Sequence, residues 1–553
     1  MLLGLHIEIW VVLGLYFAGM LALGWWSKRQ AQDREGYLVG GRRFGVPMMV
    51  MHAFGAGTNP TDTAGTISKT VAGGASGIWV SWMWMFGTPF YWLIAPVVRR
   101  MRYLTLADFY RERFGRAAAV LYTLVASVGM TIFFGGVLLA TTRTVQGMMG
   151  QTTAQVAGAV DWWFYGILLV TTVVFVVYGF WGGIVAAIRT DMVQGLMIIA
   201  LSFLAIPAAL RMAEVGGLEG MRATLAAKDT GYLKLFHPGH FSLGAVILLC
   251  INAPLTALAL PHLMSVTSSG KTEWEGRMGF AGGNLLKRVC TIGWSVLGLC
   301  WLAYLIRTGQ DVRPDAAFGD SIRHLLSPVL QGLMLACVMA ASMSSGDAVQ
   351  VTVAGLFTQS LYREYIRPDA GERQLMRFTK WTGVAIIGVS LLFAVLMQSS
   401  LVKSVIMYFN ILALVGISTA LGILWRRMNQ TGVFASTIAA TVVFLATRLI
   451  PGCPMAAKFG LPVLVGVVAG VIGSLVTRPP DAARIARFFT RIYVPIGQEE
   501  RLELSLDEAV PPAKRLCTAG GLFLVKPSTQ SWVGFLITLT ICLACVGAML
   551  VIL

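Results

Sequence analysis

Uninterrupted apolar runs of about twenty residues recur along almost the whole chain, and each is long enough to cross a bilayer as a helix. A soluble chain of 553 residues would carry about twice the 12% charged residues found here. We therefore predict an all-α polytopic membrane protein with about fourteen transmembrane helices. The predicted spans are 6–26, 46–71, 77–98, 117–148, 161–181, 183–212, 241–265, 277–306, 329–362, 375–398, 402–425, 431–449, 459–477 and 531–553.

Basic residues give the chain a net charge of +17, and they are concentrated in alternate short connections. The loop at 27–45 and the connection after 98 are rich in arginine, whereas 72–76 and 149–160 hold no Lys or Arg. This pattern follows the positive-inside rule and not that of a nucleic-acid-binding protein, so no nucleic acid partner is expected. It predicts a multi-pass protein of the cytoplasmic (inner) membrane, in contact with the lipid bilayer, with the N-terminus outside.

One sizeable polar segment, 478–530, falls on the predicted cytoplasmic side, before a last transmembrane helix at 531–553. It has a basic first half and the acidic stretch "EERLELSLDE". It is too short for a kinase or ATPase domain, and no nucleotide-binding, zinc-protease or nucleophile-elbow motif occurs in the chain. We expect a regulatory or connecting segment, and we do not expect an enzyme.

The second span contains "HAFGAGTNPTDTAG", which is too polar and too rich in helix breakers for a continuous membrane helix. Gly55 and Gly57 permit unwinding, and Pro60 removes a backbone donor. Irregular backbone at membrane depth is tolerated only where it lines a protein-enclosed cavity. The stretch therefore favours a discontinuous helix with carbonyls near Gly55 to Thr58 free to bind a cation, the alternative being a simple proline kink.

The ninth span contains "AASMSSGDAV", in which Ala341, Ser344, Ser345 and Ala348 share one helix face. The two hydroxyls suit either an alkali cation or close helix packing, and the spacing leaves both interpretations open. Asp347 follows in this span, and Asp191 lies in the sixth, where Arg189 suggests a position near the cytoplasmic end. Carboxylates inside a membrane usually face a cavity or a partner, although a structural role stays open for both.

These residues resemble the sodium/solute symporter family. The resemblance lies in "YLVGGRRFG" (37–45), "GGIVAAIRTDMVQGLM" (182–197), "PHLMS" (261–265) and "SMSSGDAVQVTVAGLFTQSLYREY" (342–365), and it extends over about residues 5 to 425. It implies two inverted five-helix repeats in a LeuT-like arrangement, at 46–212 and 241–425. Peripheral parts would be residues 1–45, helices in 431–477, the segment 478–530 and the helix 531–553.

The resemblance also implies a set of site residues. The family's sodium ligands would fall on Gly55, Thr58, Ala341, Ser344 and Ser345, and a one-residue slip would move the first two to Ala56 and Asn59. Asp191 would lie on the sodium exit path, and Asp347, where some members have a serine of a second sodium site, could hold a second cation. The solute would contact Gly57, Asn59 and Asp62, and the acidic Asp62 would disfavour an anionic solute.

The expected function is sodium-coupled secondary active symport of a small organic solute by alternating access, with Na⁺ as the coupling ion. The alternatives are a proton-coupled symporter that uses Asp347 and a transporter-like solute sensor that signals through 478–530. The sequence leaves the identity of the solute, the sodium stoichiometry and the oligomeric state open, with a monomer as one alternative.

Overall fold

The computed structural model describes residues 4–27, 40–150 and 161–553, apart from the side chains of residues 24–27, 174–175 and 177–186. Most of the predicted loop at 27–45 and of the connection at 149–160 therefore lies outside the described residues. The described chain is almost entirely helical, and nine of its helices are long and apolar enough to cross a membrane. Its one sheet pairs two short antiparallel strands, β1 (Arg515–Cys517) and β2 (Leu524–Val525).

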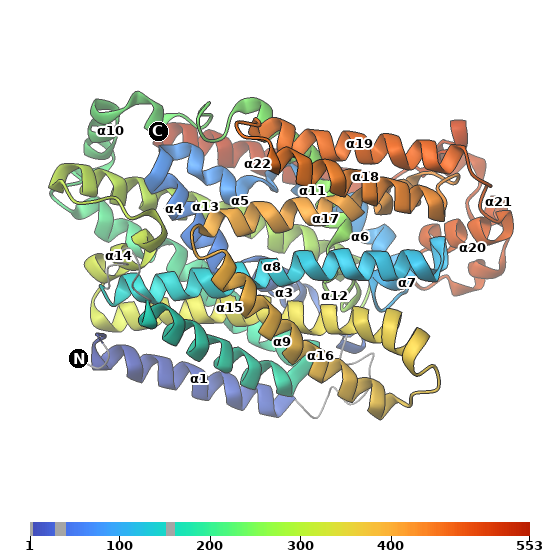
Figure 1. The fold of residues 1–553 in the computed structure, drawn as a ribbon, viewed down its shortest axis with the longest axis horizontal. Helices are drawn as coiled ribbons and strands as arrows, with labels where there is room; N and C mark the ends of the chain where they lie inside the picture. Colours follow the sequence, from blue (N-terminus) through green and yellow to red (C-terminus); the bar gives the residue numbers. More distant parts are fainter. Residues whose placement is uncertain (1–3, 28–39, 151–160) are drawn as a thin grey trace.

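Most of the long helices run side by side along the longest axis of the molecule (Figure 1). These helices are α1 (Ile7–Ser27), α8 (Arg116–Met148), α9 (Trp162–Arg211), α13 (Glu273–Thr308), α15 (Pro328–Phe357), α16 (Glu372–Leu396), α17 (Leu401–Leu424), α18 (Gln430–Leu449), α19 (Met455–Leu475) and α22 (Thr529–Ile552). The shorter helices are α3 (Val46–Gly57), α4 (Pro60–Gly73), α5 (Trp79–Trp82), α6 (Tyr91–Arg100), α7 (Leu106–Phe114), α10 (Gly217–Lys228), α11 (Leu243–Ala259), α12 (Leu263–Ser268), α14 (Ala317–Leu325), α20 (Ala482–Tyr493) and α21 (Leu506–Ala509).

The predicted third span, 77–98, is not one helix. It consists of short helical pieces: η3 (Gly74–Ile78), α5, η4 (Met85–Phe90) and α6. Protein surrounds most of this stretch, so its irregular backbone finds partners that lipid would not offer. Two buried tryptophans of this stretch bond to distant backbone. Trp79 Nε1 donates to the carbonyl of Leu235, and Trp82 Nε1 donates to the carbonyl of Arg288.

One other predicted span differs from the structure. The span 241–265 is divided into α11 and α12, with Leu260 to His262 outside either helix, because Pro261 cannot donate to a continuing helix. The predicted spans 161–181 and 183–212 both fall in the helical stretch α9, within which Trp162–Val173 and Ala187–Arg211 are separate apolar helices.

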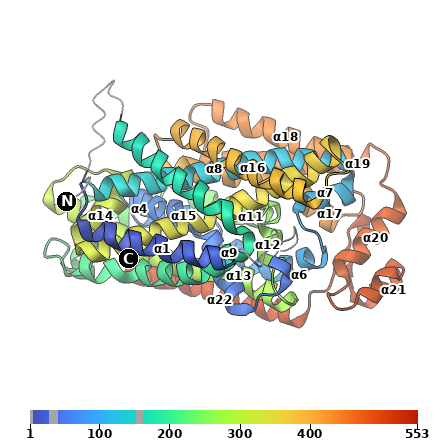
Figure 2. The same ribbon diagram turned by 90° about the horizontal axis from the view of Figure 1, so that it is seen from below.

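A broken helix opens each of the two segments that the sequence assigns to the repeats. The first segment begins with α3 and α4 and continues to α9, and the second begins with α11 and α12 and continues to α17. The N- and C-termini lie at the same end of the molecule, opposite α20 and α21, in both views (Figure 1; Figure 2).

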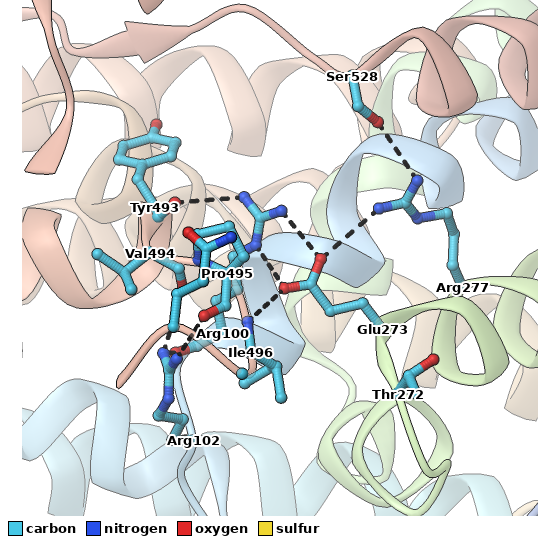
Figure 3. Close-up of polar contacts among 12 residues, drawn as sticks. Arg100, Arg102, Thr272, Glu273, Arg277, Tyr493, Val494, Pro495, Ile496 and Ser528 are labelled. Carbon is cyan, nitrogen blue, oxygen red and sulfur yellow. Dashed lines mark hydrogen bonds and ion pairs between the residues drawn. The ribbon is translucent and has the colours of Figure 1, made fainter. Parts of the chain in front are cut away.

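Residues 478–530 form a folded unit that packs on the ends of the transmembrane helices (Figure 3). Arg100 at the end of α6 pairs with Glu273 at the start of α13 at 2.8 Å, and Glu273 also accepts the backbone N–H of Ile496. Arg102 donates to the carbonyl of Pro495 at 2.9 Å. The segment therefore contacts helices of both segments that were predicted to be repeats, which the sequence did not indicate.

Candidate functional site

The first break has the residues that a helix end requires. Helix α3 ends at Gly57, and α4 starts at Pro60. The two residues between them, Thr58 and Asn59, have extended backbone. The Asn59 side chain accepts the N–H of Thr61, and the Asp62 carboxylate accepts the N–H of Asn59, so the pair forms a capping box. Proline at the first helical position costs no hydrogen bond. The predicted discontinuous helix is confirmed.

Three helices converge at Gly55. A Cβ atom placed on Gly55 would lie 2.9 Å from Ser344 Oγ of α15 and 3.1 Å from Asp191 Oδ1 of α9, so only glycine permits this approach. The other oxygen of Asp191 lies 2.7 Å from Nδ1 of His52, on α3. Asp191 is fully buried and has His52 as its partner inside the protein, so its carboxylate is not solvated.

Four buried oxygens on the first break, α9 and α15 have no hydrogen-bond partner among the described residues, and two of them, on Ser344 and Asp191, lie against Gly55. They are Thr58 Oγ1, Ser344 Oγ, Ser345 Oγ and Asp191 Oδ1. Leaving such groups unpaired costs about 1–3 kcal/mol each. By contrast, the neighbouring Ser342 hydroxyl bonds the carbonyl of Val338 and the hydroxyl of Thr141. A dehydrated alkali cation, which takes oxygen ligands, fits the unpaired set.

The remaining predicted ion-site residues lie nearby in the fold. Ala341 is buried on α15, where it lines a small cavity with Pro60 and Thr63 of α4. Asp347 is buried one turn beyond Ser344. Ala56, the alternative to Gly55 under a one-residue slip, lines a different cavity.

That second cavity, here called the central cavity, lies between the two breaks. Gly57 of the first break and Leu260 and His262 of the second line it. Five of its other lining residues are aromatic, and its free volume is about 40 Å³, room for a few water-sized groups. The aromatic residues are Trp84, Tyr91, Phe133, Phe280 and Tyr408.

The three residues predicted to contact solute have different positions. Gly57 lines the central cavity, but Asn59 and Asp62 are engaged in the cap of α4. The Asp62 carboxylate also pairs with Lys287 of α13 at 2.7 Å, and Lys287 donates to the carbonyl of Gly57 as well. Asp62 is therefore neutralised, so it does not by itself disfavour an anionic solute.

The sequence interpretation missed Lys287 and Arg288, which line the central cavity. The signal was present, since two adjacent cations occur in the middle of the apolar span 277–306 and charges inside a membrane usually have a function. Arg288 is 1% exposed and donates to the Thr88 hydroxyl at 3.2 Å and the Ser81 carbonyl at 3.0 Å.

The comparisons with known proteins point to one family. The family model for "Sodium:solute symporter family" matches residues 37–440, which is most of the chain. The osmoregulated proline transporter OpuE of Bacillus subtilis (strain 168) is 27% identical over 504 residues, covering 88% of this chain and 98% of the relative. The sodium/proline symporter of Escherichia coli (strain K12) is 23% identical over 510 residues, covering 86% and 94% of the two chains.

Among solved structures, a Na⁺-coupled sialic acid symporter in a substrate-bound outward-open state is similar in fold. Its TM-score is 0.71 at 17% identity, and the match covers 86% of this chain and 99% of that one. This likeness confirms the predicted all-α membrane fold of LeuT type. The matches are to transporters and not to enzymes. The chain belongs to the sodium:solute symporter family and is a multi-pass membrane protein that couples transport of a small organic solute to sodium.

Proposed function

We propose that the coupling sodium ion binds between the first break and α15, at Gly55, Thr58, Ala341, Ser344 and Ser345. The observation that carries this proposal is the set of buried, unpaired oxygens where Gly55 meets Ser344 and Asp191. The Thr58 hydroxyl is unpaired, whereas Asn59 is engaged in the cap, and this difference favours Gly55 and Thr58 over Ala56 and Asn59.

Asp191 supplies the negative charge that a dehydrated cation needs in a low-dielectric interior. His52 holds one carboxylate oxygen, and the other is directed toward Gly55, so the carboxylate is oriented toward the ion. Asp191 thereby has a part in binding and in the release path, and Asp347, one turn further along α15, is the candidate for a second cation.

Sodium at this position joins a broken helix of the first repeat to a helix of the second, so its binding and release can change how the repeats pack. An inward-moving monovalent cation gains about 2.3 kcal/mol from a potential of 100 mV. At about 1.4 kcal/mol per tenfold change, this is enough to concentrate a neutral solute several tens-fold, whereas a monovalent anion needs a second Na⁺ to gain the same energy, because one Na⁺ and one anion carry no net charge.

We further propose that the protein lies in the cytoplasmic membrane of a bacterium with its N-terminus outside. Support comes from the common position of the two termini and from the basic loops at the other end, near α20 and α21. Bacterial relatives named as proline transporters make a small carboxylate-bearing molecule the first candidate for the solute in the central cavity.

The sodium site is tested by thermal unfolding of purified protein in Na⁺ and in K⁺ at equal ionic strength. An ion that binds only the folded state raises the apparent stability, so we expect a higher Tm in Na⁺. The double variant Ser344→Ala/Ser345→Ala should fold but lose this difference. Ser342→Ala is the matched control, because the Ser342 hydroxyl already has partners, and it should keep the difference. A double variant that responds to Na⁺ as the parent does would refute the assignment.

A further inference from the structure

The central cavity has an excess of positive charge. Lys287 and Arg288 line it, and none of its described lining residues is acidic. Asp62, from outside the lining, pairs with Lys287, whereas Arg288 donates to the neutral Thr88 hydroxyl and Ser81 carbonyl. Asp62 also acts on Arg288, so the two buried cations share one carboxylate and favour an incoming negative group.

A second, larger cavity has the same sign. It measures about 610 Å³ and lies at the end of the molecule that holds the termini, between α4, α8 and the turn from α16 to α17. We call it the vestibule. Among its described lining residues are four cations, Lys69, Arg143, Arg313 and Lys403, and one carboxylate, Asp315.

The vestibule stays positive when the neighbouring charges are included. Asp315 accepts a hydrogen bond from Ser68. Two carboxylates lie outside the lining: Asp320 pairs with Arg313 at 3.2 Å, and Asp161, which acts on Arg143, accepts a hydrogen bond from Gln146 at 2.9 Å. The four cations still exceed the three carboxylates. Lys69 bonds His240, whose pKa is lowered by burial and by the neighbouring Lys69 and His237. His240 is therefore neutral at neutral pH and adds no charge.

Helix α4 connects the two cavities. Asp62 lies in its first turn and pairs with Lys287 of α13 beside the central cavity. Lys69 lies two turns further along α4, about 10 Å away, in the vestibule. A solute that enters from the vestibule thus meets cations first at the surface and again at the end of its path. A cleft of one sign raises the local concentration of ions of opposite sign.

We propose that the transported solute is a small organic anion, whose carboxylate binds between Lys287 and Arg288 and whose apolar part packs on the aromatic residues once the cavity widens from the few water-sized groups that it holds here. The inference rests on the proposed sodium-coupled transport through the central cavity and specifies its substrate class. The nearest carboxylate, Asp62, already has Lys287 as its partner, so an added ammonium group finds no free acceptor there. A net anion is therefore preferred to a zwitterion of the same size.

The test compares matched ligands at saturating Na⁺ by thermal shift of the full-length protein. Each set holds an acid, its neutral amide and the amino acid of similar size: propionate, propionamide and alanine, or cyclopentanecarboxylate, its carboxamide and proline. We expect an acid to stabilise the protein at a concentration about tenfold lower than its amide or amino acid does. If no acid outperforms its amide and amino acid in any set, the proposal is overturned.

The sodium-site proposal and the anion proposal can be refuted independently. Loss of the Na⁺ response in Ser344→Ala/Ser345→Ala concerns the ion site, and the ligand series concerns the charge of the solute. A vestibule variant adds a second measurement, because exposed Lys403 can change without disturbing the core. Lys403→Glu should raise the half-saturating concentration of the preferred acid by about threefold at low salt. Lys228→Glu, an equal charge change on exposed α10, should not, and equal effects of both would contradict the role of the vestibule.

Discussion

The two broken helices open onto the same cavity but are stabilised in different ways. At the break between α3 and α4, the backbone is held by charged groups, since Asp62 caps α4 and Lys287 bonds both Asp62 and the Gly57 carbonyl. At the break between α11 and α12, neutral groups suffice: the Tyr122 hydroxyl donates to the Ala259 carbonyl at 2.9 Å.

From this difference we infer that the two breaks have different roles. The charged break lies against Ser344 and Asp191, where the ion is proposed to bind, and a charged scaffold can respond to the arrival of a cation. The neutral break supplies Leu260 and His262 to the cavity wall. The first break would then act in coupling and the second in shaping the solute site.

The largest effect should come from separating the buried ion pair of the first break. Lys287→Met leaves the Asp62 carboxylate buried without its cation, and we expect a loss of about 3–5 kcal/mol in unfolding free energy. The double variant Asp62→Asn/Lys287→Met should recover much of that loss, since no charge stays unpaired. Equilibrium unfolding in mixed micelles measures both, and a double variant no more stable than Lys287→Met would show that the pair is not the cause.

A smaller effect is expected at the contact with the ion site. Gly55→Ala places a methyl group against Ser344 and Asp191, which must move, at a cost of about 1–3 kcal/mol and with weaker sodium binding. Gly57→Ala is the matched control two residues away, because its Cβ would meet only Asn284 Oδ1, at 3.6 Å. The Na⁺ concentration that half-maximally raises Tm distinguishes the two variants. Equal values would place the ion away from Gly55.

The smallest effect is expected at the neutral break. Tyr122→Phe removes one hydrogen bond to the end of α11 and should cost about 1 kcal/mol in unfolding free energy. Its sodium response in the same thermal assay should equal that of the parent. A weakened sodium response in Tyr122→Phe would mean that both breaks act in ion coupling and would end the proposed division.

Local sequence predicted the first break well. Glycines, Asn59 and Pro60 are residues that end and start helices, so their order reports the interruption without any knowledge of the fold. The signal at Leu260 to His262 was weaker, because Pro261 alone in an apolar run is compatible with either a kink or a break. The irregular stretch at 77–98 had no clear signal, because its apolar composition also suits a lipid-facing helix.

The pairing of charges could not be predicted in the same way. His52 meets Asp191 across 139 positions, and Lys287 meets the Gly57 carbonyl across 230. An intramembrane charge in a sequence predicts that a partner exists, but it does not identify which of many polar residues is that partner. Asp62 therefore suggested a solute contact when taken alone, and its engagement by Lys287 became visible only in the folded chain.

By itself, the sequence determined the membrane class, the approximate spans, the first break and the hydroxyl pair of α15, because hydrophobicity and helix-breaking residues act over a few turns. The tertiary structure alone decided which oxygens stay unpaired, which charges cancel and how 478–530 docks on the helix ends. Those properties depend on contacts between distant segments, and only packing selects one set of contacts among the many that local patterns allow.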